Sequence, residues 1–156
     1  MRIRRIYDDV NRSDREAIQA AQAILRAQFP GVPEGTVASL PEDLRDPFRS
    51  HFRSILFSAE GWGGKMRGFA LLHHAPDLDF CYLDFISAAR GGTGGGVGGA
   101  LYSRVREEAA ALDCVGIFFE CLPDDPALCH DPAVLRGFFS GLFRGAGTAR
   151  EKAPAR

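Results

Sequence analysis

Hydrophobic residues follow two different periods along the chain, and the change of period separates expected helices from expected strands. The segment 2–10 alternates enough to predict a first strand. Apolar residues then recur at helical spacing over 15–29, and the S-x-x-E sequence at 13–16 has the form of a capping box. We therefore predict a first helix that begins beside this box and ends at the Pro-Gly pair 30–31.

A second helix is predicted over 39–54. Ser39 suits its N-cap, and Pro41 suits the first turn, where a backbone N–H has no helical partner. Pro47 interrupts or restarts this helix.

From residue 55 the period shortens. Three short apolar segments, 55–60, 66–74 and 80–88, are separated by the turn sequences GWGGK and APDLD. Turn residues between apolar runs of this length are typical of an antiparallel meander.

Beyond residue 96 the pattern predicts one more helix and one more strand. The segment 98–113 carries an apolar stripe at helical spacing, and 114–122 is typical of a buried strand. The tail 135–156 mixes glycine and arginine with a short apolar patch, and we expect part of it to be disordered. The expected domain therefore covers residues 1–134.

Seven of the nine residues from 91 to 99 are glycine. A strand, a glycine-rich turn and a helix place free backbone N–H groups at a helix N-terminus, which suits a phosphate or pyrophosphate. No lysine follows, so a P-loop is rejected. The spacing of Gly94, Gly96 and Gly99 fits a Rossmann loop, but the segments before it are predicted to be antiparallel. A linker without ligand is the remaining alternative.

The segment 86–109, ISAARGGTGGGVGGALYSRVREEA, resembles the acetyl-CoA-binding motif of the GNAT superfamily of N-acetyltransferases. In that family a strand is followed by Q/R-x-x-G-x-G/A and a helix that opens with small residues and leucine. Here the strand end falls on Ala88, the Q/R position on Thr93, and G-x-G on 96–98, while 100–101 open the helix.

The resemblance implies an α/β (α+β) fold, with a mixed, largely antiparallel sheet flanked by helices. It also implies that acetyl-CoA is the cofactor, with its pyrophosphate over the glycine amides and its pantetheine arm beside the strand 84–88. Arg90 is a further candidate for a phosphate contact. The implied cofactor-binding residues are Ile86, Ala88, Thr93, Gly94, Gly95, Gly96, Val97, Gly98, Gly99 and Ala100.

The chain departs from the family's pattern in three places. Arg90 stands where proline is usual, and Thr93 stands where arginine or glutamine is usual. The family's final block is a helix followed by a strand pair, and it usually contains a tyrosine that acts as the general acid for the leaving thiolate. This block is not found in the sequence. The tail 135–156 stands in its place, so we interpret the chain as a shortened or frame-altered relative. Tyr102, on the predicted helix, is expected to pack.

Acetyl transfer to an amine needs a base for the amine proton. Glu120, at the end of the GIFFE segment, is the first candidate because an apolar strand can raise the pKa of a carboxyl group. Asp84 is the second, with Tyr82 and Ile86 expected on its face. The alternative for both is a structural carboxylate, paired with backbone N–H groups or an arginine.

The acceptor is expected to be a small-molecule or protein amine. The resemblance implies that Trp62 and the segment 29–43 line its site. His73 and His74 should point to opposite faces of a strand, with one of them exposed. A contact with the substrate is an alternative role for this pair.

Composition narrows the remaining choices. A formal net charge of −1 favours neither nucleic acid nor an anionic membrane as a partner, and no apolar run suits a signal peptide or a membrane helix. We therefore expect a cytoplasmic protein. The four cysteines lack C-x-x-C spacing, which favours buried thiols and no metal site. A non-catalytic acyl-CoA-binding domain and a dinucleotide-binding module remain alternatives, and a homodimer would cover an open sheet edge.

Overall fold

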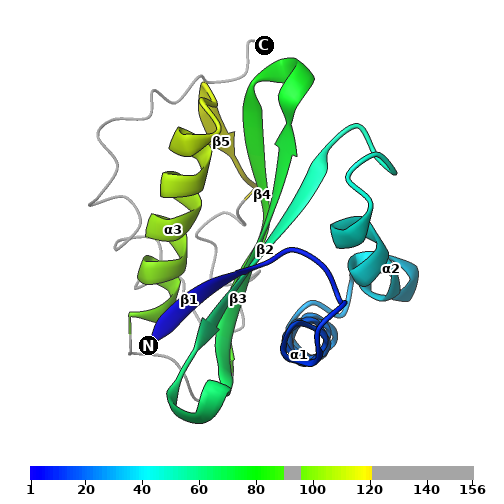
Figure 1. Ribbon diagram of the computed structural model, residues 1–156, viewed down its shortest axis with the longest axis vertical. Coiled ribbons are helices and arrows are strands. Elements are labelled where there is room, and N and C mark those ends of the chain that lie inside the picture. The colour runs from blue at the N-terminus through cyan, green and yellow to red at the C-terminus, as the bar shows by residue number, and fades with distance from the viewer. Residues whose placement is uncertain (90–95, 121–156) are drawn as a thin grey trace, which may run out of the picture. The chain divides into compact units, whose positions relative to one another are not determined.

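One five-stranded sheet organises the part of the chain that the computed structural model describes, residues 1–89 and 96–120 (Figure 1). The strands lie in the order β1-β2-β3-β4-β5. In chain order the elements are β1 (Arg2–Ile6), α1 (Arg12–Gln28), α2 (Glu34–Arg45), β2 (Arg53–Glu60), β3 (Met66–Ala75), β4 (Phe80–Ala88), α3 (Val97–Ala111) and β5 (Gly116–Phe118). Residues Met1–Glu120 form one compact unit, and the predicted boundary at 134 lies outside the described residues.

The predicted antiparallel meander is confirmed. β1 to β4 are joined by three antiparallel pairings between neighbours, whereas β5 pairs with β4 in parallel. Consecutive strands can pair in parallel only when a long connection carries the chain back to the starting end of the sheet, and α3 provides this connection between β4 and β5.

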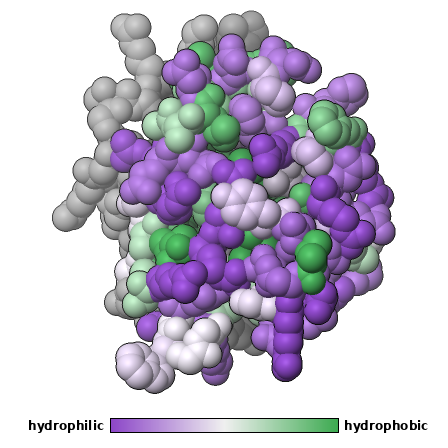
Figure 2. Space-filling view, viewed as in Figure 1, coloured by the Kyte–Doolittle hydropathy of each residue, from purple (hydrophilic) through white to green (hydrophobic). Residues whose placement is uncertain are grey.

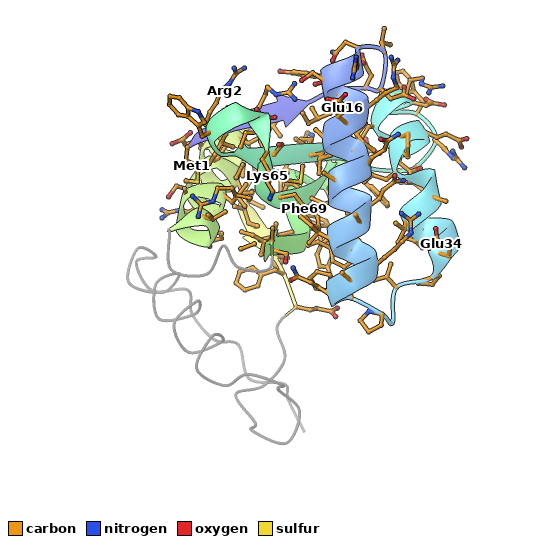
Figure 3. All side chains as sticks on the ribbon, turned by 90° about the horizontal axis from the view of Figure 1, so that it is seen from below. Met1, Arg2, Glu16, Glu34, Lys65 and Phe69 are labelled. Atoms are coloured by element: carbon orange, nitrogen blue, oxygen red, sulfur yellow. The ribbon has the colours of Figure 1, made fainter. Side chains whose placement is uncertain are left out.

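Helices cover both faces of the sheet, with α1 and α2 on one face and α3 on the other (Figure 1). Alternation along the strands supplies both cores: Leu56 of β2 packs with α1 and α2, and its neighbour Phe57 packs with α3. Figure 3 shows Phe69 of β3 beneath α1, while Glu16 and Glu34 remain exposed on the helices. Figure 2 shows a largely hydrophilic outer surface on the face viewed in Figure 1.

Helix α1 starts earlier than the sequence predicts. Its N-cap is Asn11, whose side-chain oxygen accepts a hydrogen bond from the Asp14 backbone N–H at 2.8 Å. The prediction that Ser13 caps the helix is wrong, because its hydroxyl instead accepts a hydrogen bond from the Arg4 guanidinium at 3.0 Å. The strand before this helix also ends sooner than predicted, at Ile6.

Helix α2 starts five residues before the predicted Ser39, and Pro41 lies inside it. A proline at this position cannot donate to the carbonyl of Val37, one turn earlier. The side chain of Gln22, from α1, donates to that Val37 carbonyl at 2.8 Å. A contact between helices thus replaces the missing bond and lets the helix continue through the proline.

Helix α3 buries Leu101, Val105 and Ala109, as its stripe predicts. Strand β5 is shorter than the predicted 114–122 and is not a buried strand, since Phe118 is 58% exposed. It is the last strand of the described sheet and pairs with only three residues of β4, so no described strand pairs with its other edge.

Two thiols lie where β4 begins and α3 ends. Cys81 is buried, as predicted, while Cys114 is partly exposed, and their sulfur atoms lie 3.3 Å apart. Burial and the contact with Cys114 raise the pKa of Cys81 to about 12. Cys121 and Cys129 lie outside the described residues.

Candidate functional site

Strands β4 and β5 stay together for three residue pairs only. Phe80, Cys81 and Tyr82 of β4 pair with β5, and past Tyr82 no described strand pairs with that side of β4. The second half of β4, from Leu83 to Ala88, therefore has one open edge within the described structure.

The backbone groups at this open edge belong to Ile86 and Ala88. The Ala89 backbone N–H donates to the carbonyl of Arg67, on the β3 side, at 2.8 Å. Antiparallel pairs alternate between bonded and non-bonded, so the N–H and C=O groups of Ile86 and Ala88 point away from β3. The Gln28 side chain already donates to the Ala88 carbonyl at 2.8 Å. Two of the predicted cofactor-binding residues thus present polar backbone groups here.

Gly96 is the N-cap of helix α3, and its φ of 68° lies in the left-handed region that favours glycine. The first bond of this helix runs from the Ala100 N–H to the Gly96 carbonyl at 3.0 Å. The amides of Val97, Gly98 and Gly99 precede it and have no helical acceptor, as in the first turn of any helix. The predicted contacts at Arg90, Thr93, Gly94 and Gly95 lie outside the described residues.

Gly68 of β3 brings the two halves of this site together, although no motif of the sequence singles it out. A Cβ there would lie 2.6 Å from the Ser87 carbonyl oxygen and 2.9 Å from Cγ1 of Val97, the first residue of α3. Val97 is 2% exposed, so it belongs to the core, while Gly98 is partly exposed and Gly99 is exposed. A lone glycine in an apolar strand was the only signal, and a bulge would give the same signal.

Asp84 occupies a β-bulge. Leu72 pairs with Leu83, and the preceding residue Leu71 pairs with Phe85, so Asp84 has no partner on β3. The extra residue shifts the alternation of the strand. As a result Ile86 packs on the α3 side of the sheet and Phe85 packs toward α1, which corrects the expectation that Ile86 shares a face with Asp84.

The Asp84 carboxylate ends a line of three polar side chains across neighbouring strands. Its Oδ2 lies 3.1 Å from Nε2 of His73, and Nδ1 of the same ring lies 3.2 Å from Oγ of Ser54. The Phe52 ring lies against the imidazole, with 4.5 Å between the ring centroids. Among the described side chains, Asp84 has no arginine or lysine in an ion pair with it.

Glu120 and Asp84, the two predicted bases, both lie near Tyr82. Burial, then the charge of Glu120 and then that of Asp84 raise the pKa of the Tyr82 phenol. Glu120 lies two residues beyond the end of β5 and is exposed, so the apolar strand environment expected for it is absent. The structure therefore brings both carboxylates to the point where β4 and β5 part, with different surroundings.

Comparison with solved structures identifies the architecture. A crystal structure of Tetrahymena GCN5 matches with a TM-score of 0.69 at 14% identity, over 99% of this chain and 83% of that one. A putative acetyltransferase from Agrobacterium tumefaciens gives 0.66 at 17% identity, over 100% and 99% of the two chains. The chain has the GNAT fold. A ribosomal-protein-alanine N-acetyltransferase from Brucella melitensis shares this fold, with a TM-score of 0.63 at 14% identity, over 100% and 99%. No sequence profile of a known family and no curated protein sequence matches the chain.

Within this GNAT fold, other predicted positions lie apart from the carboxylates. Trp62 is fully exposed in the turn between β2 and β3, at the opposite end of β3 from His73. His73 and His74 are both half-buried, so the expectation that one is exposed is wrong. The segment 29–43 forms mainly the first part of α2, and Tyr102 packs against Phe119, as expected. None of the described helices is long and apolar enough to cross a membrane.

Proposed function

We propose that the protein is an acetyl-CoA-dependent N-acetyltransferase that transfers an acetyl group to a primary amine. The observation that carries this proposal is the meeting of the open edge of β4 with the first turn of α3. An extended pantetheine arm needs backbone partners along a strand edge, and a diphosphate needs converging N–H groups. The GNAT fold supplies both at adjacent positions, with Gly68 allowing the close approach.

The cofactor would be held mainly by backbone atoms. The arm would bond to Ile86 and to the N–H of Ala88, while the diphosphate would accept from the amides of Gly98 and Gly99. A bound acetyl-CoA supplies the activated acetyl group. Because an acyl carbonyl gains negative charge during transfer, an unpaired strand N–H at the open edge is suited to stabilise it.

Acetyl transfer also requires that the amine lose its proton. Asp84 is the preferred base, because it lies at the parting of the strands and is hydrogen-bonded on one oxygen only among the described contacts. Glu120 is exposed nearby and is suited to attract a cationic acceptor to the same place. The negative charges of both carboxylates attract an acceptor that arrives as an ammonium ion.

Gly99 offers a sharp test of cofactor binding. It is exposed in the first turn of α3, and a Cβ there would meet nothing within 4 Å. Gly99→Asp places a carboxylate where the diphosphate should lie and also suits a helix N-terminus, so the fold should be retained. Gly99→Asn has nearly the same shape without the charge and is the matched control.

Calorimetry with acetyl-CoA should give a Kd at least about tenfold higher for Gly99→Asp than for Gly99→Asn, because two like charges then meet at close range. NAD should bind neither variant nor the parent protein. Thiol release should then appear when acetyl-CoA is mixed with a panel of primary amines. Equal affinities for the two variants would contradict the cofactor site, and tight binding without thiol release from any amine would leave a non-catalytic acyl-CoA-binding domain.

A further inference from the structure

The line Ser54–His73–Asp84 crosses three strands on the face that α1 and α2 cover, and the cofactor site described above does not use His73 or Ser54. We propose that His73, with its ring held by Ser54, is a positioning residue that orients Asp84 as the base for the acceptor amine. This inference rests on the proposed acetyltransferase function. It concerns what makes that site work rather than which cofactor it holds.

Hydrogen-bond chemistry assigns the protons along the line. An ionised carboxylate only accepts, so the Nε2 atom of His73, 3.1 Å from Asp84 Oδ2, must carry a proton. In a neutral imidazole the other nitrogen is then an acceptor, and the Ser54 hydroxyl, 3.2 Å away, donates to Nδ1. Both ring nitrogens are thereby used, so His73 acts through Asp84 and not on the acceptor itself.

Burial makes this arrangement rigid. Ser54 is 7% exposed, and the His73 side chain is 16% exposed beneath the Phe52 ring. The cross-strand register places Ser54 directly opposite His73. The Asp84 side chain is more open, at 29% exposed, so the line runs from the covered sheet outward to a carboxylate that solvent and an acceptor can reach.

The bulge gives the line its direction. Because Asp84 is the extra residue of the bulge, both it and the next residue, Phe85, can face the α1 and α2 side, which an unbroken strand would not allow. Asp84 is two residues from Ile86 along β4, or about 6–7 Å. An amine bound beside Asp84 can therefore approach a thioester held at the open edge.

With Asp84 as the base, every proton and bond of the acetyl transfer can be accounted for. The acceptor ammonium gives one proton through the free oxygen, Oδ1, to water, and the freed nitrogen lone pair then forms the C–N bond with the acetyl carbon while Oδ1 takes the second proton of that nitrogen. The C–S bond then breaks, and coenzyme A leaves as a thiolate that takes up a proton from Asp84 or water. The His73 N–H holds Oδ2 throughout, which keeps Oδ1 aimed at the amine.

His73→Leu removes the donor to Asp84, and His73→Gln keeps an N–H donor at a similar reach. His74→Leu is the matched control, because His74 follows on the opposite face of β3. We expect kcat for amine acetylation to fall about 10–100-fold in His73→Leu, with KM for acetyl-CoA changed by less than about twofold. His73→Gln should recover most of kcat, and His74→Leu should keep it.

A second measurement does not depend on turnover. Nitrogen-15 NMR of the imidazole rings at about pH 8 should show His73 as the Nε2-protonated neutral tautomer. Asp84→Asn and Ser54→Ala should each weaken that preference, and His74→Leu should not.

The outcomes separate the two claims. Equal kcat in His73→Leu and His74→Leu, or an Nδ1-protonated ring in the parent protein, would overturn the positioning role while leaving acetyl transfer intact. A parent protein that acetylates no amine would overturn the proposed function and the catalytic role of Asp84 with it. A fall in kcat that His73→Gln does not relieve would also count against positioning through the donated hydrogen bond.

Discussion

The close approach at Gly68 predicts a substitution that disturbs both walls of the candidate cofactor site. In Gly68→Ala the new Cβ would lie 2.6 Å from the Ser87 carbonyl oxygen, 2.9 Å from Val97 Cγ1 and 3.1 Å from Ala88 Cα. Two of these are backbone atoms, so no change of rotamer relieves them. The end of β4 must move, and the Val97 side chain at the start of α3 must give way as well.

The size of the effect follows from these contacts. Overpacking by one methyl group in a closed core costs about 1–3 kcal/mol. Replacing glycine in an unstrained strand position would by itself gain roughly 0.5–1 kcal/mol. We therefore expect Gly68→Ala to lower the free energy of unfolding by about 1–2 kcal/mol. Acetyl-CoA affinity should fall about tenfold, because a shift of the donors by a few tenths of an ångström weakens several hydrogen bonds together.

Urea unfolding and calorimetry with acetyl-CoA would measure both quantities. Gly116→Ala is the matched control: this glycine is also in a strand, β5, and a Cβ there would meet nothing within 4 Å. The control should be neutral or stabilising and should bind acetyl-CoA like the parent. If Gly68→Ala were as stable as Gly116→Ala and bound equally well, the reasoning about this approach would be refuted.

Two further predictions concern the frame around the site. Gln22→Ala should lower the free energy of unfolding by about 1–2 kcal/mol, because it leaves the Val37 carbonyl unpaired. In a Pro41→Ala background the loss should be smaller, because the residue at 41 then has an N–H for that carbonyl. A double-mutant cycle in urea would measure the difference. Burial raises the pKa of the Cys81 thiol from 9.0 to about 12, so the folded state keeps it protonated while the unfolded chain ionises. The free energy of unfolding should therefore keep its full value below about pH 9 and fall as the pH rises toward 12. Cys81→Ala should flatten this dependence of stability on pH, whereas Cys114→Ser should leave it unchanged if burial dominates the shift.

The sequence alone determined the kinds of element and their order. Period-two apolar runs predicted β2, β3 and β4, a helical stripe predicted α3, and the glycine-rich segment marked the strand-to-helix turn. These features depend on neighbours two to four residues apart, where side-chain direction is set by local geometry. The same local information failed at Pro41, where a helix continues because Gln22 on another helix supplies the missing bond.

Tertiary structure decided the composition of the candidate site. Ser54, His73 and Asp84 are separated by 19 and 11 residues, and only the register of β2, β3 and β4 puts them in line. The bulge that turns Asp84 toward His73 depends on which β3 residues it pairs with, and the requirement for glycine at 68 depends on where Val97 packs. Local periodicity does not encode pairing register, because any register that keeps apolar side chains on the same face satisfies the pattern equally well.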